Sequence, residues 1–218
     1  MSIKRQPTLV PSAPLFIPQK SQQHYVDKIV ANDITLCTGP AGCGKTFVPV
    51  MLAVEDFLKN RISKIVLVRP AIEACGEKLG SLPGDLLAKM DPFLAPIFDA
   101  MNEVWQNERI EEMIRKGTID IVPLAYMRGR TFNHSFIITD EAQNMNENQM
   151  LMLLTRIGKE SKMVISGDLR QNDLGHNARS GLTKALALVG KVPGLDSFEF
   201  GSDDCVRHGI ITDIIKNW

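Results

Sequence analysis

The stretch GPAGCGKT at residues 39–46 constrains the fold of this chain more than any other feature. It follows the short apolar run DITLCT at residues 33–38 and leads into residues 45–59, whose apolar spacing predicts a helix. A glycine-rich loop between a strand and a helix, ending in Gly-Lys-Thr, is typical of a loop that holds phosphate groups. The sequence therefore predicts a strand–loop–helix unit whose loop binds phosphate.

The residue types in this loop explain the expected binding. Gly39, Gly42 and Gly44 allow backbone conformations that other residues avoid, so amides from Gly42 to Thr46 can converge on phosphate oxygens at a helix N-terminus. Lys45 is expected to reach the β- and γ-phosphates, and Thr46 to bind magnesium. The predicted nucleotide-binding residues of the loop are Gly39, Pro40, Ala41, Gly42, Cys43, Gly44, Lys45 and Thr46.

Short β-branched runs alternate with longer helical stretches, which favours parallel βαβ units and an α/β fold. We expect one buried, mostly parallel, doubly wound sheet flanked by helices. Pro49, about one turn into the helix at 45–59, lacks the donor for a bond to residue 45 and is expected to distort that helix. The expected strands are 33–38, 64–68, 118–122, 135–139, 162–166 and 196–200. The other expected helices are 85–90, 93–116 with a break, 146–158, 179–189 and 208–217.

The segment FIITDEAQ at residues 136–143 places two carboxylates at the end of an apolar run. Asp140 would emerge at the carboxyl end of a buried strand, where open α/β sheets bind ligands, and is expected to hold magnesium through water. Glu141 is expected to orient or deprotonate the attacking water, because phosphoryl transfer depends mainly on positioning and charge. The plain alternative is a solvated carboxylate pair before a helix. The phosphate loop upstream on a separate strand favours the catalytic interpretation.

The segment VISGDLRQ at residues 164–171 repeats this arrangement, with Asp168 and Gln171 after a strand. The set GxxxxGKT, DEAQ and GDxxQ resembles superfamily 1 helicases, in which the last glutamine faces the γ-phosphate and couples hydrolysis to movement. The resemblance implies that role for Gln171, with a plain surface turn as the alternative. It also implies that Gln22 reads the adenine edge and that Tyr25 stacks on the base, which favours ATP over GTP. The alternative for both is an ordinary pair on a helix surface.

Two further stretches narrow the family. RPAIEACGEKLGSLPGDLLAKMDPFLAPIFDAM at residues 69–101 and RGRTF at residues 128–132 closely resemble the PhoH family, together with QQHY, DEAQN, GDLRQND, SGL and VRH elsewhere. The similarity extends over about residues 20–215. It implies a cytoplasmic ATP-binding protein with a single RecA-like domain, of a kind associated with phosphate starvation and common in bacteria and phages. Without the extra N-terminal sequence or fused PIN nuclease domain of larger relatives, the chain resembles the short, phage-encoded form.

Length and composition favour one domain. The chain has 218 residues, near the usual limit for a single core. We expect an extended, proline-rich arm over residues 1–18, which packs on a neighbouring subunit or frays. A single domain over residues 19–218 should follow, with a loop-rich insertion at about 70–117 in which Pro92 and Pro96 start short helices. The chain is 44% hydrophobic and 23% charged, and no apolar run is long enough to cross a membrane.

Predictions about metal binding, disulfides and a nucleic-acid partner depend on the cysteines, the histidines and the net charge. The cysteines show no CxxC spacing, and one lies inside the phosphate loop, which argues against zinc and disulfides and favours a reducing, cytoplasmic compartment. The histidines are equally scattered, so no metal site other than that for magnesium is expected. The formal net charge of zero neither supports nor excludes a nucleic-acid partner. The cysteines are Cys37, Cys43, Cys75 and Cys205.

Several arginines could contact phosphate. By the helicase resemblance, Arg69 would meet nucleic acid; the alternatives for its segment are a subunit interface and a solvated face. Arg128 and Arg130 suit either RNA phosphates or the ATP of a neighbouring subunit, because guanidinium groups match phosphate oxygens. Two-domain helicases donate an arginine to the γ-phosphate from the second domain. We therefore expect identical subunits to pack head to tail in a ring, with a hexamer as the expected size, so that Arg207 or Arg130 acts on an adjacent ATP.

The sequence thus predicts a magnesium-dependent ATPase that acts on RNA or single-stranded nucleic acid. Two alternatives stay open. In a regulatory module, slow ATP turnover would gate assembly without moving a strand, and in a ribonuclease a separate carboxylate cluster would be needed, although none is evident. The predicted hydrolysis residues are Lys45, Thr46, Asp140, Glu141 and Gln171.

Overall fold

The computed structural model describes residues 14–69, 86–171 and 180–204. Its strands are β1 (Ile34–Thr38), β2 (Lys64–Arg69), β3 (Ile119–Pro123), β4 (Ser135–Thr139), β5 (Lys162–Gly167) and β6 (Leu195–Glu199). Its α-helices are α1 (Lys20–Ala31), α2 (Phe47–Leu58), α3 (Leu86–Asn102), α4 (Asn107–Arg115), α5 (Glu147–Leu154) and α6 (Gly181–Leu186). Short 3-10 helices are η3 (Leu124–Tyr126), η4 (Ala142–Asn144) and η5 (Ser202–Asp204).

The strands form one parallel sheet in the order β3-β2-β4-β5-β1-β6. Strand β5 therefore lies between β1, which precedes the phosphate loop, and β4, which precedes the carboxylate pair. Thr38 at the end of β1 pairs with Gly167, and Thr139 at the end of β4 pairs with Ile165. The loops after these three strands consequently lie side by side at the carboxyl edge of the sheet, where α/β proteins bind ligands.

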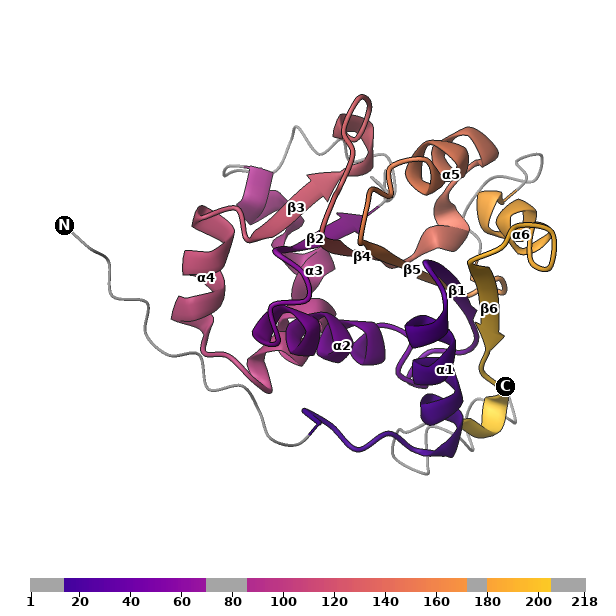
Figure 1. The fold of residues 1–218 in the computed structure, drawn as a ribbon, viewed down its shortest axis with the longest axis horizontal. Helices are drawn as coiled ribbons and strands as arrows, with labels where there is room; N and C mark the ends of the chain where they lie inside the picture. The colour runs from indigo at the N-terminus through magenta and orange to yellow at the C-terminus, as the bar shows by residue number, and fades with distance from the viewer. Residues whose placement is uncertain (1–13, 70–85, 172–179, 205–218) are drawn as a thin grey trace.

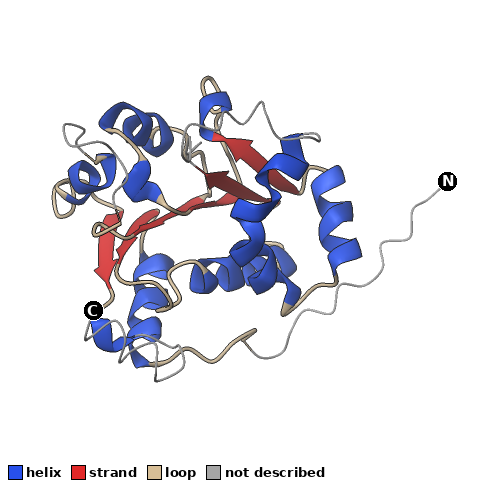
Figure 2. Ribbon diagram, turned by 180° about the vertical axis from the view of Figure 1, so that it is seen from behind, coloured by secondary structure: helices blue, strands red, loops and turns tan. Residues whose placement is uncertain are grey.

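Helices cover both faces of the sheet, with α1 and α2 on one side and α5 and α6 on the other (Figures 1 and 2). Successive side chains of a strand alternate between the two faces. In β2, Ile65 and Leu67 pack with α2, α3 and α4, whereas Val66 and Val68 pack with α5 and α6. Strands β1, β2, β4 and β5 are buried and largely apolar, as expected for the central strands of a parallel sheet, whereas the edge strands β3 and β6 are only partly buried. The predicted doubly wound α/β class is therefore confirmed.

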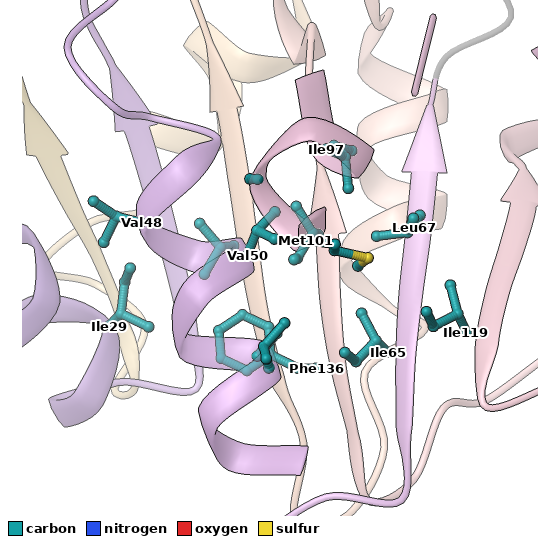
Figure 3. Packing of buried hydrophobic residues seen from close by; sticks show 14 of the residues in the cluster. Ile29, Val48, Val50, Ile65, Leu67, Ile97, Met101, Ile119 and Phe136 are labelled. Atoms are coloured by element: carbon teal, nitrogen blue, oxygen red, sulfur yellow. The ribbon is translucent and has the colours of Figure 1, made fainter. Parts of the chain in front are cut away.

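The larger of the two core layers lies under α2 and α3. Val50 of α2 and Met101 of α3 point toward Ile65 of β2 and Phe136 of β4 (Figure 3), and all four are at most 1% exposed. Burying a side chain of this size contributes about 1.5–3 kcal/mol. This layer attaches α2, and with it the end of the phosphate loop, to the sheet.

Two predictions about helices are wrong. Pro92 and Pro96 do not start separate helices, because α3 runs through both. The break predicted within residues 93–116 is confirmed and lies between Asn102 and Asn107. A proline removes one helical hydrogen bond, and here the buried face of α3, including Leu94 and Ile97, offsets that loss by packing into the core. The predicted set of helices also lacked α1, which is largely polar and buries only three of its residues, Gln22, Tyr25 and Ile29.

The N-terminal segment and the chain's last residues are only partly described. Phe16 packs edge-on against Phe47 of α2, with ring centroids 5.7 Å apart, so this part of the predicted arm contacts its own domain. Residues 1–13 and the helix predicted at 208–217 lie outside the described residues. Among the helices that are described, none is both long and apolar enough to cross a membrane.

Candidate nucleotide-binding site

The phosphate loop adopts the backbone conformation that its glycines predict. The φ angles are +142° at Gly39, +86° at Gly42 and +94° at Gly44, all in the region that side chains disfavour. Gly39 also needs its small size, since an added Cβ would lie 2.7 Å from the Cβ of Phe200 and 2.9 Å from the Phe200 carbonyl oxygen. The loop ends at Thr46, where α2 begins, so its amides lie at the N-terminus of a helix.

Lys45 lies inside the loop. Its ammonium group donates to the carbonyl oxygens of Gly39 at 2.7 Å and Pro40 at 2.6 Å. These contacts hold a positive charge within the curve of the loop, where it can meet phosphate oxygens.

Asp140 is joined to the phosphate loop by a direct hydrogen bond. The Thr46 hydroxyl donates to Asp140 Oδ2 at 2.9 Å, and the Ser166 hydroxyl of β5 donates to Asp140 Oδ1 at 3.0 Å. Asp140 is 9% exposed, and the two hydrogen bonds hold its carboxylate in one orientation at the carboxyl edge of the sheet. A hydroxyl and a carboxylate are oxygen ligands of the kind that magnesium prefers, so this pair fits a magnesium ion.

Glu141 follows Asp140 in a left-handed backbone conformation, with φ +56°. This conformation is uncommon for a residue with a side chain and occurs mainly at functional sites and turns. The Glu141 amide donates to Asp140 Oδ1 at 2.9 Å, and its carboxylate Oε2 accepts from Gln143 Nε2 at 2.7 Å. No role was predicted for Gln143 from the sequence, although this glutamine belongs to the DEAQ motif.

Gln171 lies in the turn after β5. Its Nε2 donates to Asp168 Oδ2 at 3.2 Å, and the Arg170 amide donates to Asp168 Oδ1 at 3.0 Å. The Asp168 amide in turn donates to Gln143 Oε1 at 3.1 Å. The structure therefore brings together Lys45, Thr46, Asp140, Glu141 and the turn that carries Gln171, all at one edge of the sheet.

A family model described as PhoH-like protein matches residues 17–218. The chain belongs to this PhoH-like family. A PhoH-like protein from Synechocystis is 46% identical over 195 residues, which are 89% of this chain and 59% of the relative. Protein PhoH of Escherichia coli K12 is 35% identical over 201 residues, or 91% of this chain and 56% of the relative. The PhoH-like chain thus spans a little more than half the length of these curated relatives.

The fold of this PhoH-like chain also occurs in more distant proteins. The large terminase of a thermophilic bacteriophage matches with a TM-score of 0.55 and 13% identity, over 91% of this chain and 49% of that one. At that identity the similarity concerns the fold alone. The α/β fold expected from the sequence, with its parallel, doubly wound sheet, is therefore shared with a distant protein.

In this PhoH-like domain, α1 supports the phosphate loop. Gln22 is 7% exposed, and its Nε2 donates to the Cys43 carbonyl oxygen at 3.4 Å. Tyr25 is completely buried, and its ring packs on Phe198 and Phe200 with centroids 5.6 and 5.3 Å away. Because it exposes no ring face, Tyr25 cannot stack on a base in this conformation. Gln22 lies beside the loop, so its contact with adenine stays a prediction.

The Tyr25 hydroxyl has a structural partner. It donates to the Lys45 carbonyl oxygen at 3.2 Å. In an unbroken helix that carbonyl would accept from the amide of residue 49, but residue 49 is proline. Burial raises the pKa of the Tyr25 phenol well above its usual value, so the hydroxyl stays protonated and able to donate.

Of the two arginines predicted to act across subunits, the structure describes only Arg130. Arg130 donates to Asp120 Oδ2 at 2.5 Å, and its guanidinium lies 4.7 Å from the centre of the Phe132 ring. Asp120 also pairs with Lys64, the first residue of β2, so Arg130 lies toward the amino end of the strands, away from the phosphate loop of its own subunit. Arg207 is outside the described residues.

The described residues contain no second candidate metal site. No group of three or more His, Cys, Asp or Glu side chains within them could hold a metal ion. Cys37 and Cys43 are buried free thiols, and burial raises the pKa of Cys43 above its usual value. Burial therefore favours the protonated form of the thiol inside the phosphate loop.

Proposed function

We propose that this chain binds and hydrolyses ATP with magnesium. The observation that carries the proposal is the hydrogen bond between Thr46 and Asp140, 2.9 Å long, which joins the phosphate loop to the carboxylate pair. Glu141 directly follows Asp140, and Lys45 directly precedes Thr46 in the loop. Phosphoryl transfer requires a loop that binds phosphate, a pair of side chains that can hold magnesium, here Thr46 and Asp140, and a carboxylate beside them.

Each residue then has one role in the reaction. The loop amides and Lys45 bind the β- and γ-phosphates and stabilise their charge, while Thr46 and Asp140 would hold the magnesium ion. Magnesium, when bound, supplies positive charge to the phosphate oxygens. Glu141 orients a water molecule for attack on the γ-phosphorus and accepts its proton, while the bond from that phosphorus to the β,γ-bridging oxygen breaks and ADP leaves. Gln171, at the end of the 168–171 turn, contacts the γ-phosphate and responds to its loss.

The test compares two variants. Glu141→Gln keeps the shape of the side chain but cannot accept the proton, so we expect turnover to fall by about 10²–10⁴-fold while ATP still binds. Lys45→Ala removes the charge in the loop and should weaken ATP binding itself. Phosphate release and the affinity for a fluorescent ATP analogue would be measured for both. Full turnover in Glu141→Gln would contradict the proposal.

We further propose that hydrolysis is coupled to RNA or another single-stranded nucleic acid. Tyr126, on η3 after the carboxyl end of β3, is 68% exposed, and Arg128 two residues later is also exposed. The residue just before η3, Pro123, pairs with Arg69, so η3 begins beside the end of β2. An exposed aromatic ring near an arginine suits a single strand, which binds by stacking its bases and pairing its phosphates.

RNA-stimulated turnover tests this coupling. We expect single-stranded RNA to raise the ATPase rate, and Tyr126→Ala to increase the RNA concentration needed for half-maximal stimulation by about 5–100-fold, the loss of one stacked base. Tyr126→Phe keeps the ring and is the matched control. No response to RNA or single-stranded DNA would favour the alternative, a regulatory module in which ATP turnover gates assembly. RNA cleavage that survives Lys45→Ala would favour a ribonuclease.

We also propose that the active assembly is a cytoplasmic ring of identical subunits. Arg130 lies away from the loop of its own subunit and pairs with Asp120, so it would have to leave that pair to act on the ATP of a neighbour. An arginine supplied by an adjacent subunit can accelerate phosphoryl transfer by about 10³–10⁵-fold. Sedimentation with ATP and magnesium would measure the size of the ring, with six subunits as the expectation.

A further inference from the structure

Gln143 connects two parts of the site that come from different strands. Its Nε2 donates to Glu141 Oε2 at 2.7 Å, and its Oε1 accepts from the Asp168 amide at 3.1 Å. Glu141 follows β4 and Asp168 follows β5. A single side-chain amide therefore joins the proposed catalytic carboxylate to the turn that carries Gln171.

The chemistry of the two contacts determines which way the amide points. An ionised carboxylate can only accept, and a backbone N–H can only donate, so the NH₂ group must face Glu141 and the oxygen must face Asp168. A glutamine side chain supplies both the donor for Glu141 and the acceptor for Asp168. An ionised glutamate lacks the donor, and a hydrophobic residue lacks both. Gln143 is also 1% exposed, so water is not a ready substitute for either contact.

The surrounding structure fixes the backbone of Gln143 and leaves room for its side chain. The Ser180 hydroxyl, just before α6, donates to the main-chain carbonyl oxygen of Gln143 at 3.2 Å. At the end of β5, a Cβ on Gly167 would lie 2.7 Å from Gln143 Oε1 and 3.0 Å from its backbone nitrogen. The glycine therefore lets β5 approach closely enough for the Asp168 amide to reach Gln143.

We propose that Gln143 is a positioning residue that couples the 168–171 turn to Glu141. This inference rests on the proposed ATP hydrolysis. Asp168 holds Gln171 and the Arg170 amide through its carboxylate and holds Gln143 through its own amide. A shift of the turn when Gln171 meets the γ-phosphate is thus passed to the Glu141 carboxylate, which is aligned for water only when the turn is engaged.

The test uses a variant of the same size without hydrogen-bonding groups. We expect Gln143→Met to lower kcat by about 10–100-fold, as a small misplacement of a catalytic group does, with the affinity for ATP analogue within twofold of the unaltered chain. In a Glu141→Gln background the same change should lower kcat no further, since there is no carboxylate to align. Gln23→Met is the matched control, because Gln23 likewise donates to a carboxylate, that of Asp27 at 2.8 Å, on the exposed face of α1.

A second variant separates activity from folding. Gln143→Glu keeps the acceptor for Asp168 but places a carboxylate against Glu141, so both stability and kcat should fall. Combining it with Glu141→Gln exchanges donor and acceptor; we expect the thermal midpoint to recover and kcat to stay low.

The outcomes distinguish this inference from the proposed function. If Gln143→Met keeps kcat within twofold while Glu141→Gln abolishes turnover, the coupling role is wrong and the proposed ATPase stands. If Glu141→Gln itself turns over normally, the proposed function fails. If Gln143→Met lowers kcat and the affinity for ATP by the same factor, Gln143 supports the structure of the whole site and does not align Glu141. That result would overturn the inference.

Discussion

At the scale of single residues, Tyr25 and Pro49 show how the phosphate loop is supported by a distant part of the chain. Pro49 leaves the Lys45 carbonyl without its helical donor, and the Tyr25 hydroxyl takes that donor's place. The hydroxyl belongs to α1, whereas the carbonyl belongs to the catalytic lysine. Pro49 does not break α2, which runs from Phe47 to Leu58, and Tyr25 supplies the hydrogen-bond donor that Pro49 lacks.

This pairing predicts a compensating effect between two substitutions. Tyr25→Phe removes only the hydroxyl and should lower the free energy of unfolding by about 1–3 kcal/mol, because the Lys45 carbonyl loses its partner. Adding Pro49→Ala supplies an amide that can donate to that carbonyl, so the double variant should recover part of the loss. Urea unfolding of both single variants and the double variant gives the interaction energy. Strictly additive effects would contradict the assignment.

At the scale of elements, η4 directly follows Glu141 and leads into α5, whose first turn is capped by Asn146. The Asn146 side chain accepts from the Gln149 amide at 3.0 Å, while Gln149 Oε1 accepts from the Asn146 amide at 2.9 Å. These two bonds form a capping box. The Met145 carbonyl oxygen also accepts from the Gly181 amide at 2.7 Å, which ties the segment to α6.

The cap should therefore matter for stability. We expect Asn146→Ala to lower the free energy of unfolding by about 1 kcal/mol, since it leaves an amide of the first turn without its acceptor. Gln106→Ala is a suitable control, because Gln106 occupies the same position before α4 but makes no side-chain cap. Thermal and urea unfolding of both variants would measure the difference. Equal effects at the two positions would show that the cap contributes nothing specific.

At the scale of the whole molecule, the proposed ring makes each active site a shared one. The loop and carboxylates come from one subunit, and Arg207 or Arg130 from the next. A subunit with Lys45→Ala has no working loop but keeps its arginines, whereas a subunit with Arg207→Ala keeps its loop. Mixing the two inactive variants should restore part of the ATPase rate at their common interfaces.

The control for this experiment mixes Lys45→Ala with Glu141→Gln. Both lesions lie in the half of the site that one subunit supplies, so no interface is repaired and the rate should stay low. If neither Arg207→Ala nor Arg130→Ala is rescued by Lys45→Ala subunits, or if a monomer is fully active, the shared site is excluded. Rescue of only one arginine variant would identify the donated residue.

Local sequence rules accounted for much of the fold and the nucleotide site. All six strands lie within about a residue of their predicted bounds, and Gly39, Gly42 and Gly44 have the positive φ angles expected of them. These features depend on a few adjacent residues, through steric limits on the backbone and the apolar character of buried strands. The position of Asp140 and Glu141 after β4 follows from the same local pattern.

Contacts between distant segments were decided only by the tertiary structure. The order of strands places β5 between β1 and β4, and this brings Ser166 to Asp140 and Gln143 to Asp168. It also buries Tyr25 under the loop, where the sequence predicted a ring stacked on adenine. Neither side-chain pairing is encoded by spacing along the chain, because each depends on which strands become neighbours. The sequence by itself thus determined the parts of the site, and the packing of the sheet decided how those parts are joined.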